Sequence, residues 1–303
     1  MTRLSLAVGL VGALALSACS SNSSTPPVDS GAMDVPPDLG PPLVTISGTA
    51  APHPLTAALE APTPTDFSQL AVAVVDPSIV LANPAAPPLK GGPLDTSAGN
   101  CGAAGCAWSF DSVNIVTISL GLVGIIDDTR TAGRLWLKTG TGAGAADFIN
   151  AAKISRAPIT DRRLFAVSKA TEAKLALFAA AVITPADAAL VPGALETRGF
   201  MIGTVVSKLS EGAHPVGGAV ITTTDTRTNI IYPNDGFTAP ASSTSAVHGT
   251  FLVVPKPVAT PTSIVATWNV TSPAGDARVW PSLTAGSTPG TCFVILFAAN
   301  ETP

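Results

Sequence analysis

Short apolar runs separated by turn residues cover most of the chain after residue 43. In several runs large apolar residues alternate with polar ones, as in Trp108-Ser109-Phe110, and this alternation is typical of half-buried strands. The 28 prolines and 27 glycines, which interrupt helices, separate the runs at short intervals. The pattern predicts a mainly β fold. Strands are expected at residues 44–49, 70–75, 79–81, 108–110, 113–126, 134–138, 163–167, 200–206, 215–222, 230–232, 249–254, 263–270 and 292–298.

One stretch in the middle of the chain has helical periodicity instead. Between Lys169 and Val182 the apolar residues recur at helical spacing, and Ser168 can cap the first turn. Thr184-Pro185 has the pattern of a second helix start. The apolar face most simply packs on a sheet, with a ligand groove as the alternative. We therefore expect two antiparallel β-sandwich units, residues 43–167 and 199–303, joined by a helical connector at 168–198.

The first 18 residues have the pattern of an export signal. Arg3 precedes an uncharged run at residues 4–18, which is shorter than the roughly 20 residues of a membrane span but typical of a signal peptide. Leu16-Ser17-Ala18-Cys19 resembles the lipobox of bacterial lipoproteins. That resemblance implies cleavage before Cys19 and acylation of its thiol and new amino group. The alternative is an ordinary signal peptide with a chance cysteine.

Residues 19–42 are rich in Ser, Pro and Asp and predict a solvated tether after the lipidated cysteine. Stable membrane attachment takes more than one acyl chain, and a triacylated Cys19 would carry three. In lipoproteins of bacteria with two membranes, Asp after the cysteine often marks retention in the inner membrane. Ser20 stands there in this chain, so the resemblance implies a lipid anchor in the outer membrane.

Charged residues make up only 12% of the chain, with 16 Lys and Arg against 20 Asp and Glu. Nucleic acid is therefore not expected as a partner, because no basic surplus exists to neutralise phosphates. The apolar content of 46% argues against a disordered chain.

Three motifs in the last third resemble the carboxypeptidase regulatory-like, or transthyretin-like, domain. They are Gly203-Thr204-Val205, the run from Pro215 to Val220, and Gly249-Thr250-Phe251. The resemblance implies a β-sandwich over residues 199–303 that serves as an accessory module rather than as a protease. Ile46-Ser47-Gly48-Thr49 is similar to the first motif, so residues 44–126 are either a diverged repeat or a chance match.

Cys101 and Cys106 are predicted to form a disulfide. Exported compartments are oxidising, and the small residues 102–105 allow the two ends to approach. Cys292 is then the odd thiol, and we expect it to be buried in its strand.

The residue types that carry catalysis or bind metals are scattered along the chain. Each histidine lies beside Pro or Gly and has no ligand neighbour at a metal-binding spacing. The acidic residues of two turns could contact calcium, but they fit surface turns better. These histidines and acidic residues are His53, His214 and His248, and Asp127, Asp128 and Asp225.

Two further patterns have a functional and a structural interpretation. The run from Gly140 to Ala145 can be aligned with a dinucleotide-binding loop, with Asp161 about twenty residues later, but a flexible loop fits the surrounding β pattern better. Exposed aromatic rings could form a sugar-binding platform, although most are expected in the core. The candidates are Trp108, Trp136, Trp268 and Trp280.

We therefore expect no catalytic residue, metal ligand or cofactor. The leading hypothesis is a non-catalytic, lipid-anchored envelope protein that binds a glycan or an envelope protein or has a structural role. The alternative is an envelope enzyme whose site is assembled from scattered Asp, Glu and His residues. Two histidines beside a carboxylate in a deep cleft would favour the enzyme.

Overall fold

A computed structural model describes residues 40–300, except 64, 84, 103, 104, 184–186 and 188. The expected signal peptide (1–18), Cys19 and all but the last three residues of the tether (19–42) lie outside the described residues. So does the helix start at Thr184-Pro185. The chain from Gly40 onward forms one compact unit.

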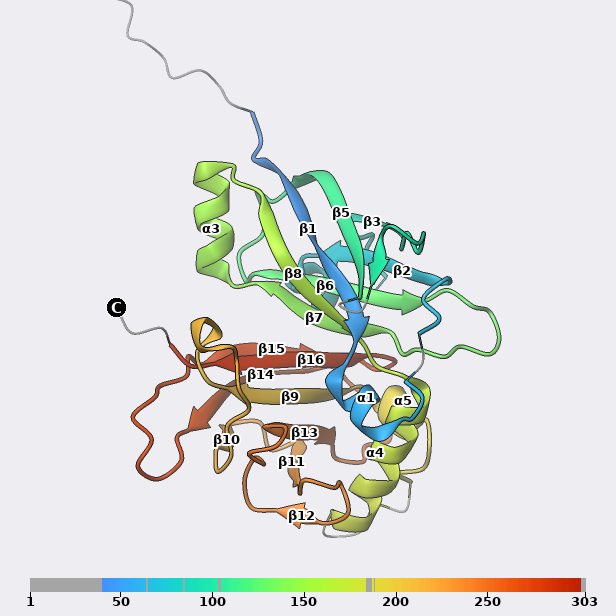
Figure 1. Cartoon of the computed structure of the whole chain (residues 1–303), viewed down its shortest axis with the longest axis vertical. Coiled ribbons are helices and arrows are strands. Elements are labelled where there is room, and N and C mark those ends of the chain that lie inside the picture. The colour runs from blue at the N-terminus through green and yellow to red at the C-terminus, as the bar shows by residue number, and fades with distance from the viewer. Residues whose placement is uncertain are drawn as a thin grey trace, which may run out of the picture. The chain divides into compact units, whose positions relative to one another are not determined.

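Strands dominate this unit, as the apolar pattern predicts, so the mainly β fold is confirmed (Figure 1). The strands are β1 (Leu43–Pro52), β2 (Leu70–Val75), β3 (Lys90–Pro93), β4 (Cys101–Gly102), β5 (Gly105–Asn114), β6 (Leu122–Asp128), β7 (Thr139–Gly144), β8 (Ile159–Ala166), β9 (Phe200–Val206), β10 (Val220–Thr223), β11 (Thr228–Pro233), β12 (Pro240–Ala241), β13 (Thr250–Pro255), β14 (Ile264–Thr271), β15 (Leu283–Ser287) and β16 (Cys292–Ala298). The helices are α1 (Pro54–Leu59), α2 (Pro77–Ala82), α3 (Ala146–Ser155), α4 (Lys169–Val182) and α5 (Ala194–Arg198).

The strands form three sheets. A nine-stranded sheet has the order β12-β11-β13-β9-β16-β7-β6-β2-β3. A four-stranded sheet, β4-β5-β1-β8, and a three-stranded sheet, β10-β14-β15, complete the set. Buried apolar side chains of β1, β5 and β8 form one core with those of β2 and β6. Helix α4 packs on one face of β9, β13 and β16, and the three-stranded sheet packs on the other.

The two expected units share the nine-stranded sheet. β16, near the end of the chain, lies parallel to β7 from the first half and to β9 from the second. β1 and β8 are also parallel, so the strand pairing is mixed rather than purely antiparallel. The packing of the sheets against one another confirms the expected β-sandwich. β9 and β13 are apolar on nearly every residue because both of their faces are covered. Residues 168–198 contain helices α4 and α5 and connect β8 of the four-stranded sheet to β9 of the nine-stranded sheet.

Several expected elements have the predicted bounds. β2, β9 and β16 coincide with the apolar runs, and α4 spans the expected residues 169–182. The Ser168 side chain caps α4 by accepting a hydrogen bond from the Thr171 N–H. Leu175, Phe178 and Ala179 are buried against the sheet, as their helical spacing predicts.

Other expectations were wrong. Residues 79–81 belong to α2, because Asp76 caps a helix with Pro77 in its first turn. The run 113–126 is broken between β5 and β6, and residues 134–138 contain only an isolated bridge between Trp136 and Ser168. The glycine-rich segment expected as a loop is strand β7, near the centre of the large sheet. Helix α3 follows that strand directly, and no residue of the run forms a phosphate-binding turn.

No helix within the described ranges has the length and apolar character of a membrane span.

Candidate functional site

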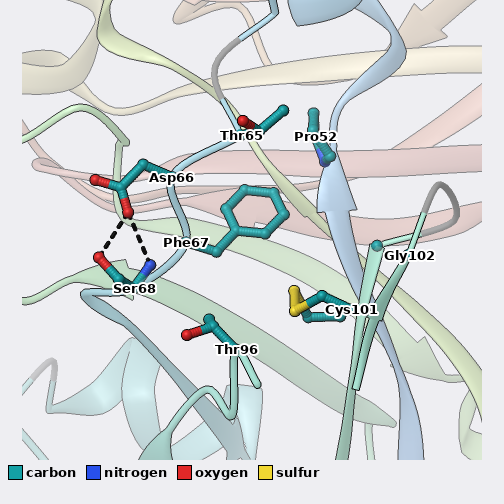
Figure 2. A pocket seen from close by; sticks show the side chains of 10 residues that line it. Pro52, Thr65, Asp66, Phe67, Ser68, Thr96, Cys101 and Gly102 are labelled. Carbon is teal, nitrogen blue, oxygen red and sulfur yellow. Dashed lines mark hydrogen bonds between the residues drawn. A yellow bond between two sulfur atoms is a disulfide. The ribbon is translucent and has the colours of Figure 1, made fainter. Parts of the chain in front are cut away.

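A hollow of about 440 Å³ lies between the segment Thr65–Ser68 and the hairpin of β4 and β5 (Figure 2). The Phe67 ring projects into it, between Pro52 and Cys101, and the hydroxyl groups of Thr65, Ser68 and Thr96 lie around it. The lining residues are Pro52, Thr65, Asp66, Phe67, Ser68, Thr96, Cys101, Gly102, Gly105 and Cys106.

One wall of the hollow is fixed by the predicted disulfide. Cys101 and Cys106 are bonded, with their Cα atoms 4.0 Å apart, so this prediction is confirmed. The Asn100 side-chain amide donates hydrogen bonds to the carbonyl oxygens of Asp95 (2.6 Å) and Ala107 (2.7 Å). These bonds hold the loop before β4 against β5. Cys292 is a buried free thiol, as expected, and burial raises its pKa well above the ordinary value.

The opposite wall is fixed by an aspartate turn. The Asp66 carboxylate accepts hydrogen bonds from the Ser68 backbone N–H (3.0 Å) and hydroxyl (2.6 Å). These bonds, with a smaller effect of Arg130, lower the pKa of Asp66, so the carboxylate remains ionised at neutral pH. The Phe67 ring packs on Trp136, with ring centroids 5.1 Å apart.

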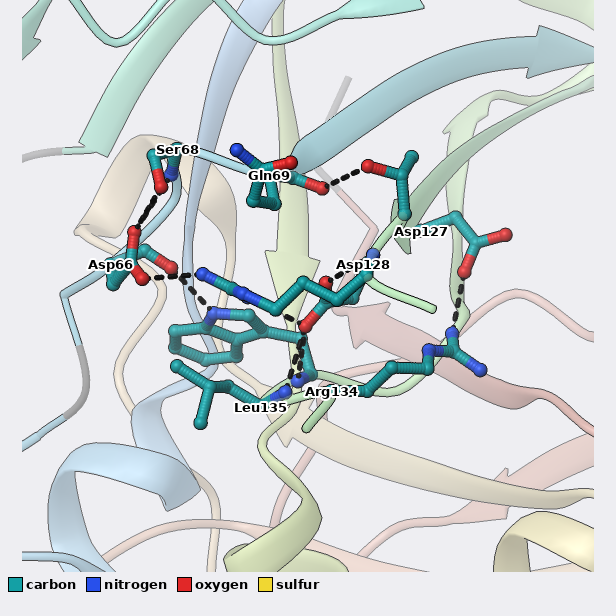
Figure 3. Close-up of polar contacts among 10 residues, drawn as sticks. Asp66, Ser68, Gln69, Asp127, Asp128, Arg134 and Leu135 are labelled. Atoms are coloured by element: carbon teal, nitrogen blue, oxygen red, sulfur yellow. Dashed lines mark hydrogen bonds and ion pairs between the residues drawn. The ribbon is translucent and has the colours of Figure 1, made fainter. Parts of the chain in front are cut away.

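The buried carboxylate of Asp128 is linked to this wall through Arg130 (Figure 3). Asp128 accepts hydrogen bonds from the backbone N–H groups of Leu135 (2.8 Å) and Trp136 (3.1 Å). The Arg130 guanidinium forms an ion pair with Asp128 at 2.8 Å and a second one with Asp66. Burial alone would raise the pKa of Asp128, but the backbone and Arg130 hydrogen bonds outweigh it and the pKa is lowered.

Neighbouring charges are also paired. Arg134 forms an ion pair with Asp127 at 2.6 Å. In the second half of the chain, between β10 and β11, Asp225 pairs with Arg227 at 2.6 Å. Asp128 was expected in a surface turn, and this was wrong, because the loop 129–136 folds over it and uses it as an acceptor. Among the residues that the structure describes, no group of three or more His, Cys, Asp or Glu side chains is placed to hold a metal ion.

The three histidines have separate surroundings. His53 is buried and caps α1 by accepting the Leu55 N–H at Nδ1, and burial lowers its pKa to about 3. His248 accepts the Thr250 N–H at Nδ1, and its Nε2 lies 3.2 Å from the Asn234 carbonyl oxygen. The His214 backbone N–H donates a hydrogen bond of 3.0 Å to the Ser207 hydroxyl. The structure therefore does not bring these histidines together beside one carboxylate.

The four tryptophans are all buried, as expected for most of them. Three donate their indole N–H to backbone carbonyl oxygens: Trp136 to Asp66, Trp268 to Ala285 and Trp280 to Val206. Among the described residues, none forms a hydrogen bond with the buried Trp108 Nε1. Trp108 also lines a second, wider hollow of about 740 Å³ that includes Phe110, Asn100, Asp161 and Arg163.

The first hollow combines an apolar floor with hydrogen-bond acceptors. Pro52, Phe67 and the disulfide provide the apolar surface, and Asp66 adds a negative charge near the border. Such a surface can bind an apolar group that carries a hydroxyl or amino donor. The sequence reasoning did not single out Asp66 or Phe67. The available signal was the spacing Asp-x-Ser, which recurs at 66–68, 76–78 and 95–97 and forms the same turn each time.

No protein-family model and no curated protein sequence matches the chain. Among solved structures, the chain has a faint likeness to shaft pilin SpaA from Lactobacillus rhamnosus GG. The match covers 86% of this chain and 99% of the pilin at 10% identity, with a TM-score of 0.20. A double mutant of the same pilin gives a TM-score of 0.21 at 10% identity, over 86% of this chain and 98% of that one. TM-scores this low assign neither a family nor a function.

Proposed function

We propose that this chain is an exported, lipid-anchored envelope protein with a binding role rather than a catalytic one. The Cys101–Cys106 disulfide is the observation that carries the proposal, since such bonds persist in oxidising compartments and are rare in the cytosol. The signal pattern and lipobox at residues 1–19 support the same compartment.

Acylation of Cys19 would hold the folded unit at the outer membrane. Metabolic labelling with a palmitate analogue tests this directly. The wild-type chain is expected to carry the label and Cys19→Ala to lose it, while Cys292→Ala, which removes a buried thiol, retains it. A labelled Cys19→Ala variant would refute the lipid anchor.

The hollow beside the disulfide is the site that we propose for the ligand. Its apolar floor and charged border are suited to a glycan or to a side chain of an envelope protein. The two classes can be separated by a pull-down from envelope extracts in which glycan and protein fractions are analysed independently.

A matched pair of glycine variants makes this test specific. Gly102 lines the hollow, and a Cβ atom added to it meets no atom within 4 Å. Gly102→Leu therefore adds bulk to the lining of the hollow without a steric clash at its Cβ, and we expect it to reduce capture of the ligand. Gly99 has equally open surroundings but does not line the hollow, so Gly99→Leu should capture as wild type does. Equal capture by both variants would place the ligand elsewhere.

The carboxypeptidase regulatory-like resemblance of residues 199–303 is part of the proposal. Two of its motifs meet in the structure, where Gly203 of β9 lies opposite Phe251 of β13. An accessory role for this region predicts that capture of the ligand depends on the hollow in the first half. Loss of capture from substitutions confined to the surface of β10, β14 and β15 would contradict that division.

A further inference from the structure

We propose that the end of the folded unit at which Gly40 begins lies on the lipid bilayer. The contact surface is formed by Leu43, Val116 and Ile154, and we name it the amino-terminal face. The proposal rests on the lipid anchor proposed above and adds which surface of the protein contacts the membrane.

Exposed apolar side chains are concentrated in this region. Of the fifteen large apolar side chains that are exposed in the described part of the chain, five belong to β1, the loop after β5 and helix α3. Ile154 is 87% exposed, Val116 50% and Leu43 46%. Single exposed apolar residues are ordinary on a protein surface, but a cluster of them marks a site of interaction. The five side chains are those of Leu43, Val116, Leu120, Phe148 and Ile154.

Hydrogen bonds tie the three segments together. The Ile115 backbone N–H donates to the Pro42 carbonyl oxygen at 3.3 Å, which places the loop after β5 beside the start of β1. Lys153 of α3 donates to the Ile118 carbonyl oxygen of that loop. Arg156, directly after α3, donates to the carbonyl oxygens of Gly40 (2.6 Å) and Pro41 (3.2 Å). Residues that are far apart in the sequence therefore form one surface beside the point where the described chain begins (Figure 1).

Helix α3 has one buried side and one exposed apolar residue. Ile149 and Ala152 are buried in the core below the helix, so the packing requirement of α3 is met by its inner side. Ile154 lies five residues after Ile149, on the outer side of the helix. No described residue covers it, so its apolar side chain stays in contact with water and does not contribute the free energy of burial.

The position of the tether selects the bilayer as the partner. Cys19 precedes Gly40 by 21 residues, and the tether that the sequence predicts there would span on the order of 25 Å if it behaves as a flexible coil. A lipid-anchored Cys19 therefore gives the surface around Gly40 a higher effective concentration at the membrane than any other surface of the unit. Apolar side chains at that position are suited to burial at the boundary between headgroups and acyl chains.

The charges of this end are compatible with a lipid surface. Lys153 and Arg156 donate to backbone carbonyl oxygens rather than to carboxylates, so their positive charges remain available to anionic headgroups. The acidic residues on this end are Asp147, in the first turn of α3, and Asp111 of β5, which accepts from the Thr45 hydroxyl of β1 at 2.8 Å. Asp161 of the neighbouring β8 accepts from the Thr160 hydroxyl. These carboxylates limit the electrostatic contribution, so apolar contact supplies most of the expected attraction.

A fluorescent probe at Ile154 tests the proposal. Ile154→Cys would be produced as the full lipidated chain, labelled with an environment-sensitive dye, and reconstituted into vesicles of phosphatidylethanolamine and phosphatidylglycerol. Cys292 is buried and Cys101 and Cys106 are bonded, so the new thiol is the one that reacts. Leu177→Cys is the matched control, because Leu177 is 58% exposed on α4. α4 contacts α1, which follows β1, so the two probes are separated by about the 30 Å length of that strand.

The expected result is a blue shift and increased emission of the dye at 154 on vesicle binding, with quenching by nitroxide-labelled lipids, and no change at 177. If the chain floats with the vesicles and neither probe responds, the lipid anchor stands and the amino-terminal face is overturned. A response at both positions would also overturn it, because the contact would not be specific to this face. If the chain does not float with the vesicles, the proposed anchor is wrong and the contact surface is rejected with it. Circular dichroism of each labelled variant checks that the fold is retained.

Discussion

The indole N–H of Trp136 donates a hydrogen bond of 2.9 Å to the carbonyl oxygen of Asp66, which lies 70 residues earlier in the chain. This bond joins the loop after β6 to the wall of the candidate hollow. Trp136 has no exposed surface, so the indole is both a core residue and a support for the site. The packing of Trp136 in the core therefore also fixes the position of Asp66 at the wall of the hollow.

Asp128→Asn should lower the free energy of unfolding by about 2–4 kcal/mol, because a buried acceptor for charged and backbone donors is weakened. The pKa of Asp128 is lowered in the folded protein, so its contribution is complete above the unfolded value near 3.8 and is lost as the pH falls below it. Asp127→Asn is the control. Its carboxylate is 39% exposed in a surface ion pair, and its loss should cost less than about 1 kcal/mol. Urea titrations followed by tryptophan fluorescence measure the free energy of unfolding of both variants. Equal losses would contradict the claim that the buried Asp128 contacts stabilise the fold more than the surface ion pair does.

His53 should make the protein less stable in mild acid. Burial lowers its pKa from 6.5 to about 3, so the unfolded chain binds a proton that the folded chain does not. The contribution of neutral His53 to the free energy of unfolding is fully present above pH 6.5. It falls as the pH decreases toward 3, by up to about 1.4 kcal/mol per pH unit. Asn is also a good helix cap but does not titrate. His53→Asn should therefore flatten the dependence of unfolding free energy on pH between about 4 and 6.5, and an unchanged slope would assign it to other groups.

Gly203→Ala should destabilise the large sheet by about 2–3 kcal/mol through overpacking. A Cβ atom at residue 203 would lie 1.9 Å from Cζ of Phe251 on the neighbouring strand. Gly142 of β7 has no atom within 4 Å of such a Cβ, so Gly142→Ala should be close to neutral. The cost at Gly203 should shrink in a Phe251→Leu background, because the two residues share one space. Thermal unfolding of the four variants and the wild type measures this, and additive effects would disprove the steric cause.

Removing the disulfide should affect the hollow more than the fold. Cys101 and Cys106 are five residues apart, and closing so short a loop contributes only about 2 kcal/mol. The Cys101→Ser, Cys106→Ser double variant should remain folded by circular dichroism but lose ligand capture, since both cysteines line the hollow. Alkylation of the unfolded wild-type chain without reductant should modify Cys292 and neither Cys101 nor Cys106. Modification of all three would show that the bond is absent.

Local signals in the sequence determined the elements that need no distant partner. Ser168 and the apolar spacing of residues 169–182 define α4, because a capping hydroxyl and a one-sided apolar face act within a few turns. The apolar run 70–75, which turn residues bound, defines β2 in the same way. The small size of residues 102–105, together with the oxidising compartment that the export signal implies, predicted the disulfide.

The tertiary structure alone decided which strands are neighbours and where the hollow lies. The glycine-rich β7 has little strand propensity, but β16 and β6 supply hydrogen-bonding partners on both of its edges, and pairing overrides propensity in a central strand. Asp66, Asp128 and Trp136 are separated by up to 70 residues, so no local pattern contains their contacts. The sequence by itself determined a mainly β protein with one disulfide. The shared sheet, the buried Asp128 and the candidate site depend on long-range packing, because burial and pairing energies arise only when distant segments meet.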